Sequence, residues 1–363
     1  MTSPQTPAVP RTGVPLAGYT TLRLGGPVER FVRAERAADL VETVRRADTS
    51  DTPLLVLGGG SNLVIGDEGI PGAAVQIATS GVGYDRLGDG QVHLTVEAGM
   101  DWDETVARTV AEGLGGLECL SGIPGLVGAT PVQNVGAYGV EVAQRLVSVD
   151  LLDRRSGQVR TVAAGQLGLG YRTSVLKNTD AAVVLRVRFT LADGGLSAPI
   201  RYAELARTLG VAAGERVPVA QARAAVLELR RGKGMVLDTE DHDTWSAGSF
   251  FTNPVVPDEA LAAVRALVTA RLGPDTTMPT YPAGPGHAKL SAAWLIERAG
   301  FHRGYAGPGG RVSLSTKHTL ALTNRGRAAT TDLLALAGEV RDGVLAAFGV
   351  RLAPEPVLVG CSL

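Results

Sequence analysis

The sequence predicts an α+β protein of two or three domains, and three observations lead to this class. A chain of 363 residues is too long for one simple hydrophobic core. Hydrophobic residues make up 45% and charged residues 20% of the chain, as is typical of folded globular proteins. Short apolar runs that suit strands occur together with longer amphipathic stretches that suit helices, in both halves of the chain.

The first residues are rich in Pro and Thr, and a disordered tail is predicted over residues 1–16. The first ten residues have neither a basic segment nor an apolar one, so we expect no signal peptide.

A glycine-rich turn follows the first predicted strand, residues 53–57. It consists of Gly58, Gly59, Gly60, Ser61 and Asn62, and a second strand is expected directly after it, at residues 63–65, before a turn at 66–69. A Rossmann dinucleotide fold needs a helix at this point, so that fold is rejected. The successive N–H groups can still form an anion-binding nest for a pyrophosphate. The alternative is that the three glycines only make a tight turn.

The most informative segment runs from Gly122 to Gly139 with the sequence GIPGLVGATPVQNVGAYG. Its glycines and prolines oppose a helix, and it carries no charge. It is also too apolar for a solvated linker. We therefore expect irregular backbone that presents N–H groups to a large ligand, such as a nucleotide cofactor with a flat ring system and a pyrophosphate.

The remaining elements follow from periodicity. Helices are expected at residues 39–47, 102–112 (closed by Gly113), 199–209 (although Arg201 and Tyr202 could precede it), 219–231, 258–271, 291–298 and 331–348. Strands are expected at residues 73–77, 92–97, 148–153, 158–162, 182–190, 312–314 and 320–323, and just after Glu355.

Composition excludes several classes of function. The net charge of −1 implies no basic face for nucleic acid. No apolar run approaches the length of a membrane span. Cys119 and Cys361 are the only cysteines, and the five histidines lack ligand spacing, so neither a disulfide framework nor a metal site is expected. We expect a cytoplasmic protein.

Two short motifs carry candidate polar groups. In the segment GYRTS, Arg172 could bind a carboxylate through its guanidinium, although such arginines are usually solvated. In SAGSFFTNP, small residues expose Ser249 at a turn before two phenylalanines, and Asn253 precedes a proline and must be extended. A serine hydrolase is disfavoured because no nucleophile elbow is present.

Two further groups are weaker candidates when taken alone. Glu355 lies between two prolines that would hold its carboxylate, although an acid in a terminal turn is often only exposed. Lys233, in RRGKG, lacks the spacing of a P-loop but could bind a phosphate as a point charge.

Together these motifs resemble, in order and spacing, the UDP-N-acetylenolpyruvoylglucosamine reductase family, from about Gly18 to Gly360. The resemblance implies an FAD-binding fold of the vanillyl-alcohol-oxidase (PCMH) type and a C-terminal α/β domain that binds substrate. The implied FAD-binding subdomains are 17–78, joined by 350–363, and 79–230, and the substrate-binding domain is 231–349.

The resemblance also implies the site residues. The implied cofactor is non-covalent FAD, with NADPH as the implied co-substrate. The residues expected to bind FAD are Gly58, Gly59, Gly60, Ser61, Asn62, Gly122, Ile123, Pro124, Gly128, Ala129, Gln133, Asn134, Gly139 and Arg230. Tyr171, Tyr202, Lys233 and Asn253 are expected to bind the substrate, a UDP-sugar enolpyruvyl ether, and Tyr202 matches a loop that closes over it in a longer subtype. A monomer is expected.

Three residues are implied to be catalytic. Arg172 and Glu355 would stabilise the charge that develops next to the substrate carboxylate, and Ser249 would donate the final proton. Ala353 and Pro356 depart from the family's pattern, and an extra residue near Tyr305 and Ala306 obscures one substrate contact.

Two other functions remain open at this point. One is a sugar or alcohol oxidase on the same flavin fold, many of which attach flavin through His or Cys. The turn 58–62 has neither residue, and Cys119 is the only nearby candidate. The other is a non-catalytic FAD- or UDP-sugar-binding module, which the joint presence of Arg172, Ser249 and Glu355 argues against.

Overall fold

The computed structural model describes residues 9–363, and these form two compact units. Unit 1 contains residues 9–14, 28–60 and 71–236, and unit 2 contains residues 15–27, 61–70 and 237–363. The predicted tail at 1–16 lies partly outside the described residues, and its last part is ordered, because Arg11–Pro15 forms strand β1. The three predicted domains stay a prediction. The implied FAD subdomain 79–230 lies in unit 1, whereas the one at 17–78 and 350–363 is divided between the two units.

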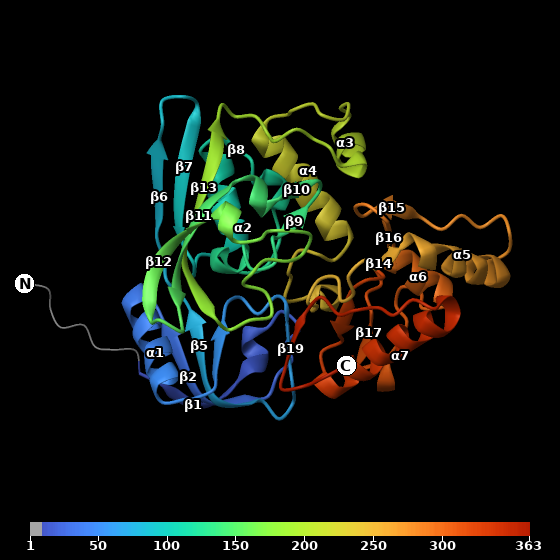
Figure 1. Ribbon diagram of the computed structural model, residues 1–363, viewed down its shortest axis with the longest axis horizontal. Helices are drawn as coiled ribbons and strands as arrows, with labels where there is room; N and C mark the ends of the chain where they lie inside the picture. Colours follow the sequence, from blue (N-terminus) through green and yellow to red (C-terminus); the bar gives the residue numbers. More distant parts are fainter. Residues whose placement is uncertain (1–8) are drawn as a thin grey trace, which may run out of the picture. The chain divides into compact units, whose positions relative to one another are not determined.

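The main sheet of unit 1 is antiparallel, with the order β12-β11-β13-β7-β6 and with β8 paired to the end of β13 (Figure 1). Its strands are β6 (Val82–Arg86), β7 (Gln91–Glu97), β8 (Leu114–Gly115), β11 (Leu146–Asp153), β12 (Gln158–Ala163) and β13 (Ala182–Asp193). In β7, buried Val92, Leu94 and Val96 alternate with half-exposed residues, as expected of a strand with one face on the core.

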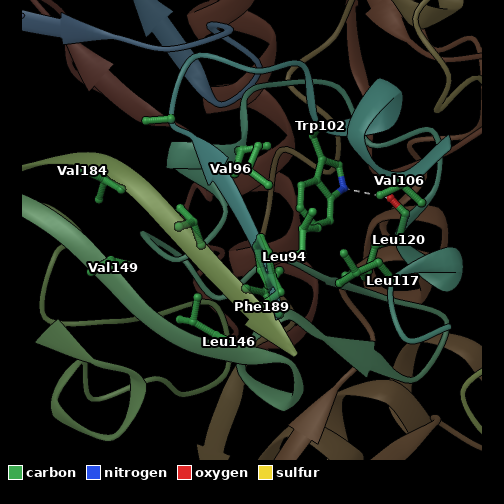
Figure 2. Close-up of a cluster of buried hydrophobic side chains, with 14 of the residues drawn as sticks. Leu94, Val96, Trp102, Val106, Leu117, Leu120, Leu146, Val149, Val184 and Phe189 are labelled. Carbon is green, nitrogen blue, oxygen red and sulfur yellow. Dashed lines mark hydrogen bonds between the residues drawn. The ribbon is translucent and has the colours of Figure 1, made fainter. Parts of the chain in front are cut away.

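The helices of unit 1 are α1 (Ala37–Thr49), α2 (Trp102–Ala111), α3 (Ala203–Leu209) and α4 (Val219–Gly232). Asp101 caps the N-terminus of α2, because its side chain accepts a hydrogen bond from the amide of Glu104 at 2.8 Å. Figure 2 shows Trp102 at the first turn of this helix, packed in the hydrophobic core beside Phe189 of β13. The Trp102 Nε1 donates to the carbonyl of Leu120 at 3.0 Å, so the polar atom of this buried ring is satisfied.

A smaller sheet has the order β1-β2-β5-β3, formed by Arg11–Pro15, Pro27–Ala34, Ile70–Ile77 and Leu54–Leu57. Strand β3 runs parallel to β5. After β3 the chain passes through the glycines directly into β4 (Leu63–Ile65), with no helix between them. The rejection of a Rossmann fold is therefore confirmed.

Unit 2 is built from short strands and three helices. Strand β4 pairs in parallel with β19 (Val357–Val359), and β14 (Val255–Pro257), β16 (His287–Leu290) and β15 (Thr280–Pro282) form a second sheet. Strands β17 (Val312–Leu314) and β18 (Leu322–Asn324) form a hairpin. Helices α5 (Asp258–Leu272), α6 (Ala292–Ala299) and α7 (Thr330–Phe348) complete the unit.

The elements expected from the sequence are present, with three differences. The helix predicted at 199–209 begins only at Ala203, because Tyr202 is extended, with φ −83° and ψ 118°. The strand predicted at 320–323 is shifted to 322–324. Several strands were missed, among them β1, β6 and the β14–β16–β15 sheet. The Gly122–Gly139 segment also ends in a short strand, β9 (Gly136–Ala137), which pairs with β10 (Val140–Glu141) directly after the segment.

Candidate active site

The two glycine-rich segments of unit 1 touch each other through their backbones. A Cβ atom added to Gly59 would lie 2.7 Å from the Cα of Gly125, which is closer than real Cβ contacts allow. Gly125 is held in position by α2, because its carbonyl accepts a hydrogen bond from the amide of Trp102 at 3.0 Å. Only glycine fits at position 59, and at this point the backbones of the two segments pack directly against each other.

The start of the second segment is held by charged side chains of two helices. Asp103 of α2 accepts two hydrogen bonds from Arg223 of α4, at 2.6 and 2.9 Å, and a third from the amide of Gly122 at 2.6 Å. Although burial acts to raise the pKa of Asp103, these hydrogen bonds keep it below its usual value. The carboxylate is therefore ionised at neutral pH and anchors the loop.

Arg230, on the last turn of α4, has a spare donor in a buried place. Its Nη2 donates to the carbonyls of Met235 at 2.7 Å and Gly122 at 3.3 Å. Its Nε is buried and has no hydrogen-bond partner among residues 9–363. Burial lowers the pKa of Arg230 to about 10, so the group is still charged at pH 7. A buried cation with an unused donor beside a glycine-rich backbone fits an anionic cofactor such as the pyrophosphate of FAD.

The other cofactor-binding candidates of unit 1 lie on the same segment. Gly128 packs against Ala98 so closely that a Cβ would lie 2.5 Å from the Ala98 Cβ. Asn134 is buried, and its side chain bonds to Glu141, to the carbonyl of Gly170 and to the amide of Ala143. The amide group of Asn134 therefore holds the protein together, and a contact with a cofactor would use its main chain. Along this segment Ile123, Pro124 and Gln133 are half-buried, and Ala129 and Gly139 are exposed.

The Asn134–Gly170 hydrogen bond ties the glycine-rich segment to the turn that carries Tyr171 and Arg172. Arg172 has a positive φ of 53°, and its Nη2 donates to the carbonyl of Gly136 at 2.9 Å. Its guanidinium lies 5.4 Å from the centre of the Tyr171 ring, which is 46% exposed. A strained backbone that places an arginine against the loop is the kind of feature that functional sites retain.

Tyr202 and Lys233 lie near each other in unit 1. The Tyr138 ring packs edge-on against Tyr202 with centroids 5.4 Å apart, and the Lys233 Nζ lies 5.9 Å from the Tyr138 centroid. Lys233 also forms an ion pair with Glu204 at 2.6 Å. Burial raises the pKa of Tyr138 to about 12, so its hydroxyl remains a donor at neutral pH.

In unit 2, two distant segments pair and bring Ser249 and Glu355 onto adjacent stretches of chain. Phe251 and Pro354 form an antiparallel bridge, and the amide of Glu355 donates to the carbonyl of Phe250 at 2.9 Å. Phe250 and Phe251 are 1% exposed and anchor this pairing in the core, while Ser249 and Glu355 are half-exposed. The sequence motifs predicted each residue but not this pairing.

Asn62 and Asn253 are the other predicted site residues in unit 2 with resolved contacts. The Asn62 carbonyl accepts from the amide of Val357 at 2.9 Å, and its Nδ2 donates to the Glu355 carbonyl at 3.4 Å. The Asn253 Oδ1 accepts from the amide of Ala292 at the start of α6, at 3.0 Å. A ligand contact by Asn253 would therefore come from its Nδ2. Ser61 adjoins Asn62 and is half-buried.

Sequence reasoning missed three polar residues of these clusters, namely Asp103, Tyr138 and Glu204. One signal was available for Glu204, because it follows the predicted substrate residue Tyr202 by two positions. The bond of Asp103 to Gly122 joins residues 19 positions apart, and no local pattern indicates it.

No helix within residues 9–363 is both long and apolar enough to cross a lipid bilayer.

Comparisons with known proteins agree with this architecture. Residues 239–359 match a family model described as UDP-N-acetylenolpyruvoylglucosamine reductase, C-terminal domain, and residues 28–163 match one described as FAD binding domain. A UDP-N-acetylenolpyruvoylglucosamine reductase of Saccharopolyspora erythraea is 69% identical over 98% of this chain and 97% of its own length. That of Nocardia farcinica is 60% identical over 99% of this chain and 92% of its own length.

The crystal structure of UDP-N-acetylenolpyruvylglucosamine reductase from Thermus caldophilus is similar to this one, with a TM-score of 0.63 and 25% identity, over 97% of this chain and all of that one. The predicted fold class, an FAD-binding fold with a C-terminal α/β domain, is confirmed. With relatives this similar over nearly its whole length, the chain belongs to the UDP-N-acetylenolpyruvoylglucosamine reductase family.

Proposed function

We propose that this protein reduces UDP-N-acetylglucosamine enolpyruvate to UDP-N-acetylmuramate, with Arg172, Ser249 and Glu355 as its catalytic residues. It is an FAD-dependent oxidoreductase of peptidoglycan precursor synthesis that uses NADPH as co-substrate. The observation that most supports these roles is the pairing of the Ser249 and Glu355 segments in unit 2. Substrate-dependent consumption of NADPH by the purified protein tests the activity.

When bound, FAD would supply the hydride-transfer chemistry that links NADPH to the terminal vinyl carbon of the substrate. The protein stabilises the negative charge that then develops on the neighbouring carbon and in the carboxylate. We assign this role to the Arg172 guanidinium, which suits a carboxylate, and to Glu355 as a protonated or proton-sharing carboxyl. Ser249 then donates its hydroxyl proton to the carbanionic carbon, which is basic enough to accept it.

Tyr171, Tyr202, Lys233 and Asn253 are proposed to bind the substrate away from the reacting carbons. We expect Tyr202→Phe and Lys233→Ala to raise the KM for the enolpyruvyl substrate more than they lower kcat, because binding that is equal in ground and transition states changes KM alone. Steady-state kinetics of each variant measures this. Arg231→Ala is a matched control, since Arg231 is an exposed cation near Lys233. Loss of kcat with unchanged binding would contradict the assignment.

FAD is proposed to be held without a covalent bond. The one nearby cysteine, Cys119, is 1% exposed, and burial raises the pKa of its thiol to about 12, so it is not a thiolate at neutral pH. We expect the yellow colour to leave the protein completely on acid precipitation and to appear in the supernatant. Colour retained in the precipitate would instead support a covalent flavin and the oxidase alternative.

The cytoplasm is proposed as the location, because NADPH and UDP-sugars are cytoplasmic metabolites. A monomeric state is proposed as well. Light scattering of the FAD-loaded protein tests the monomer.

A further inference from the structure

Lys233 already has an anionic partner in unit 1. Its Nζ lies 2.6 Å from the Glu204 Oε2, and the two side chains are only 34% and 32% exposed. Lys233 directly follows the last residue of α4, and Glu204 is in the first turn of α3. Each group is favourably placed with respect to its own helix, since a cation suits a C-terminus and an anion an N-terminus. The ion pair therefore joins two helix ends.

Glu204 is also close in sequence to the tyrosine proposed to contact the substrate. Tyr202 is the extended residue immediately before α3, and Glu204 is two residues later. Tyr202 packs on Tyr138, and Lys233 lies near the same Tyr138 ring. Lys233 therefore has a direct ionic link to the segment that carries Tyr202.

A diphosphate that binds Lys233 must come within hydrogen-bond distance of the same Nζ. The Glu204 carboxylate and a phosphate oxygen on one ammonium group would repel each other, because like charges in a half-buried place are weakly screened. The carboxylate and the diphosphate therefore compete for Lys233.

We propose that Glu204 is an internal counter-ion of Lys233 that the diphosphate of the UDP-sugar displaces when it binds. The exchange releases the first turn of α3 from α4 and so couples the charge of Lys233 to the position of the Tyr202 segment. Glu204 thereby lowers the affinity of the substrate-free protein for anions that lack the rest of the substrate. This inference rests on the proposed role of Lys233 in substrate binding.

The test measures UDP binding to the FAD-loaded protein by calorimetry. Glu204→Gln keeps the size of the side chain and removes its charge, so we expect UDP to bind about two- to fivefold more tightly, the range expected for loss of a partly exposed ion pair. Glu228→Gln is the matched control, because it removes one exposed carboxylate from α4 and is expected to leave UDP binding unchanged. In the double variant Glu204→Gln with Lys233→Ala, the gain is expected to disappear.

The outcomes separate the two ideas. If Lys233→Ala weakens UDP binding but Glu204→Gln does not strengthen it, the proposed counter-ion exchange is wrong and the role of Lys233 stands. If Lys233→Ala has no effect on UDP binding, the proposed role of Lys233 itself is wrong. A gain from Glu204→Gln that persists without Lys233 also overturns the exchange. Thermal unfolding of each variant distinguishes a change in affinity from a loss of folded protein.

Discussion

Replacing Ser249 by alanine is expected to leave the reduction of bound FAD by NADPH close to that of the unaltered protein. The oxidation of the reduced protein by the enolpyruvyl substrate should slow by about 10²–10⁴-fold, the usual contribution of a positioned proton donor. The two effects differ because the hydroxyl is proposed to act only after hydride has left the cofactor. Stopped-flow recording of the flavin absorbance, first with NADPH and then with substrate, measures each half-reaction separately.

The structure supplies a control for this experiment. The hydroxyl of Thr252, three residues after Ser249, donates a hydrogen bond to the Ala353 carbonyl at 3.4 Å. Thr252→Val removes a hydroxyl from the same strand pairing, and both half-reactions should remain near normal. A loss in Ser249→Ala larger than the expected range would indicate an added structural role, since Phe250 beside it is in the core. Normal oxidation by substrate in Ser249→Ala would show that Ser249 is not the proton donor.

The sequence predicts what depends on local pattern. The strand–glycine–strand order around Gly58 excluded the Rossmann fold, and the uncharged Gly122–Gly139 segment indicated irregular backbone; the structure has both features. The alternation in β7 and the caps of α2 are likewise local. The hydrophobic pattern did not reveal β1 or β6, because four of the five residues in each strand are exposed and no apolar alternation marks a buried face.

The arrangement of the candidate site depends on contacts that no window of sequence contains. The Arg172 side chain bonds to Gly136 across 36 positions of sequence, and the Glu355 amide bonds to Phe250 across 105 positions. The motifs identified the residue types, and the resemblance suggested their roles, but the pairing of Phe251 with Pro354 is a property of the folded chain. The Lys233–Glu204 ion pair is of the same kind, since its partners lie at the ends of two different helices.

The second large effect is expected from Gly59→Ala. The new methyl group would lie 2.7 Å from the Cα and 3.2 Å from the carbonyl carbon of Gly125, both main-chain atoms. The Gly125 segment cannot move away from the new methyl group without breaking hydrogen bonds. The amide of Trp102 donates to the Gly125 carbonyl, and the amide of Val127 donates to the Met100 carbonyl. We expect a loss of stability of about 1–3 kcal/mol from overpacking, together with failure to retain FAD, because the two glycine segments must separate.

Gly58→Ala is the matched control for stability, since the same methyl group one residue earlier would meet only Ala129 and Leu126 side-chain atoms, each at 3.9 Å. That distance is an ordinary contact, so thermal unfolding of FAD-free Gly58→Ala should be close to that of the unaltered protein, and Gly59→Ala should unfold at a lower temperature. FAD titration of both proteins then separates two causes of lost binding.

Weak FAD binding by Gly58→Ala without loss of stability would mean that the cofactor itself approaches this backbone, as expected of a phosphate-binding turn. If Gly59→Ala matched the unaltered protein in both measurements, the close packing of the two segments would not be what shapes the cofactor site.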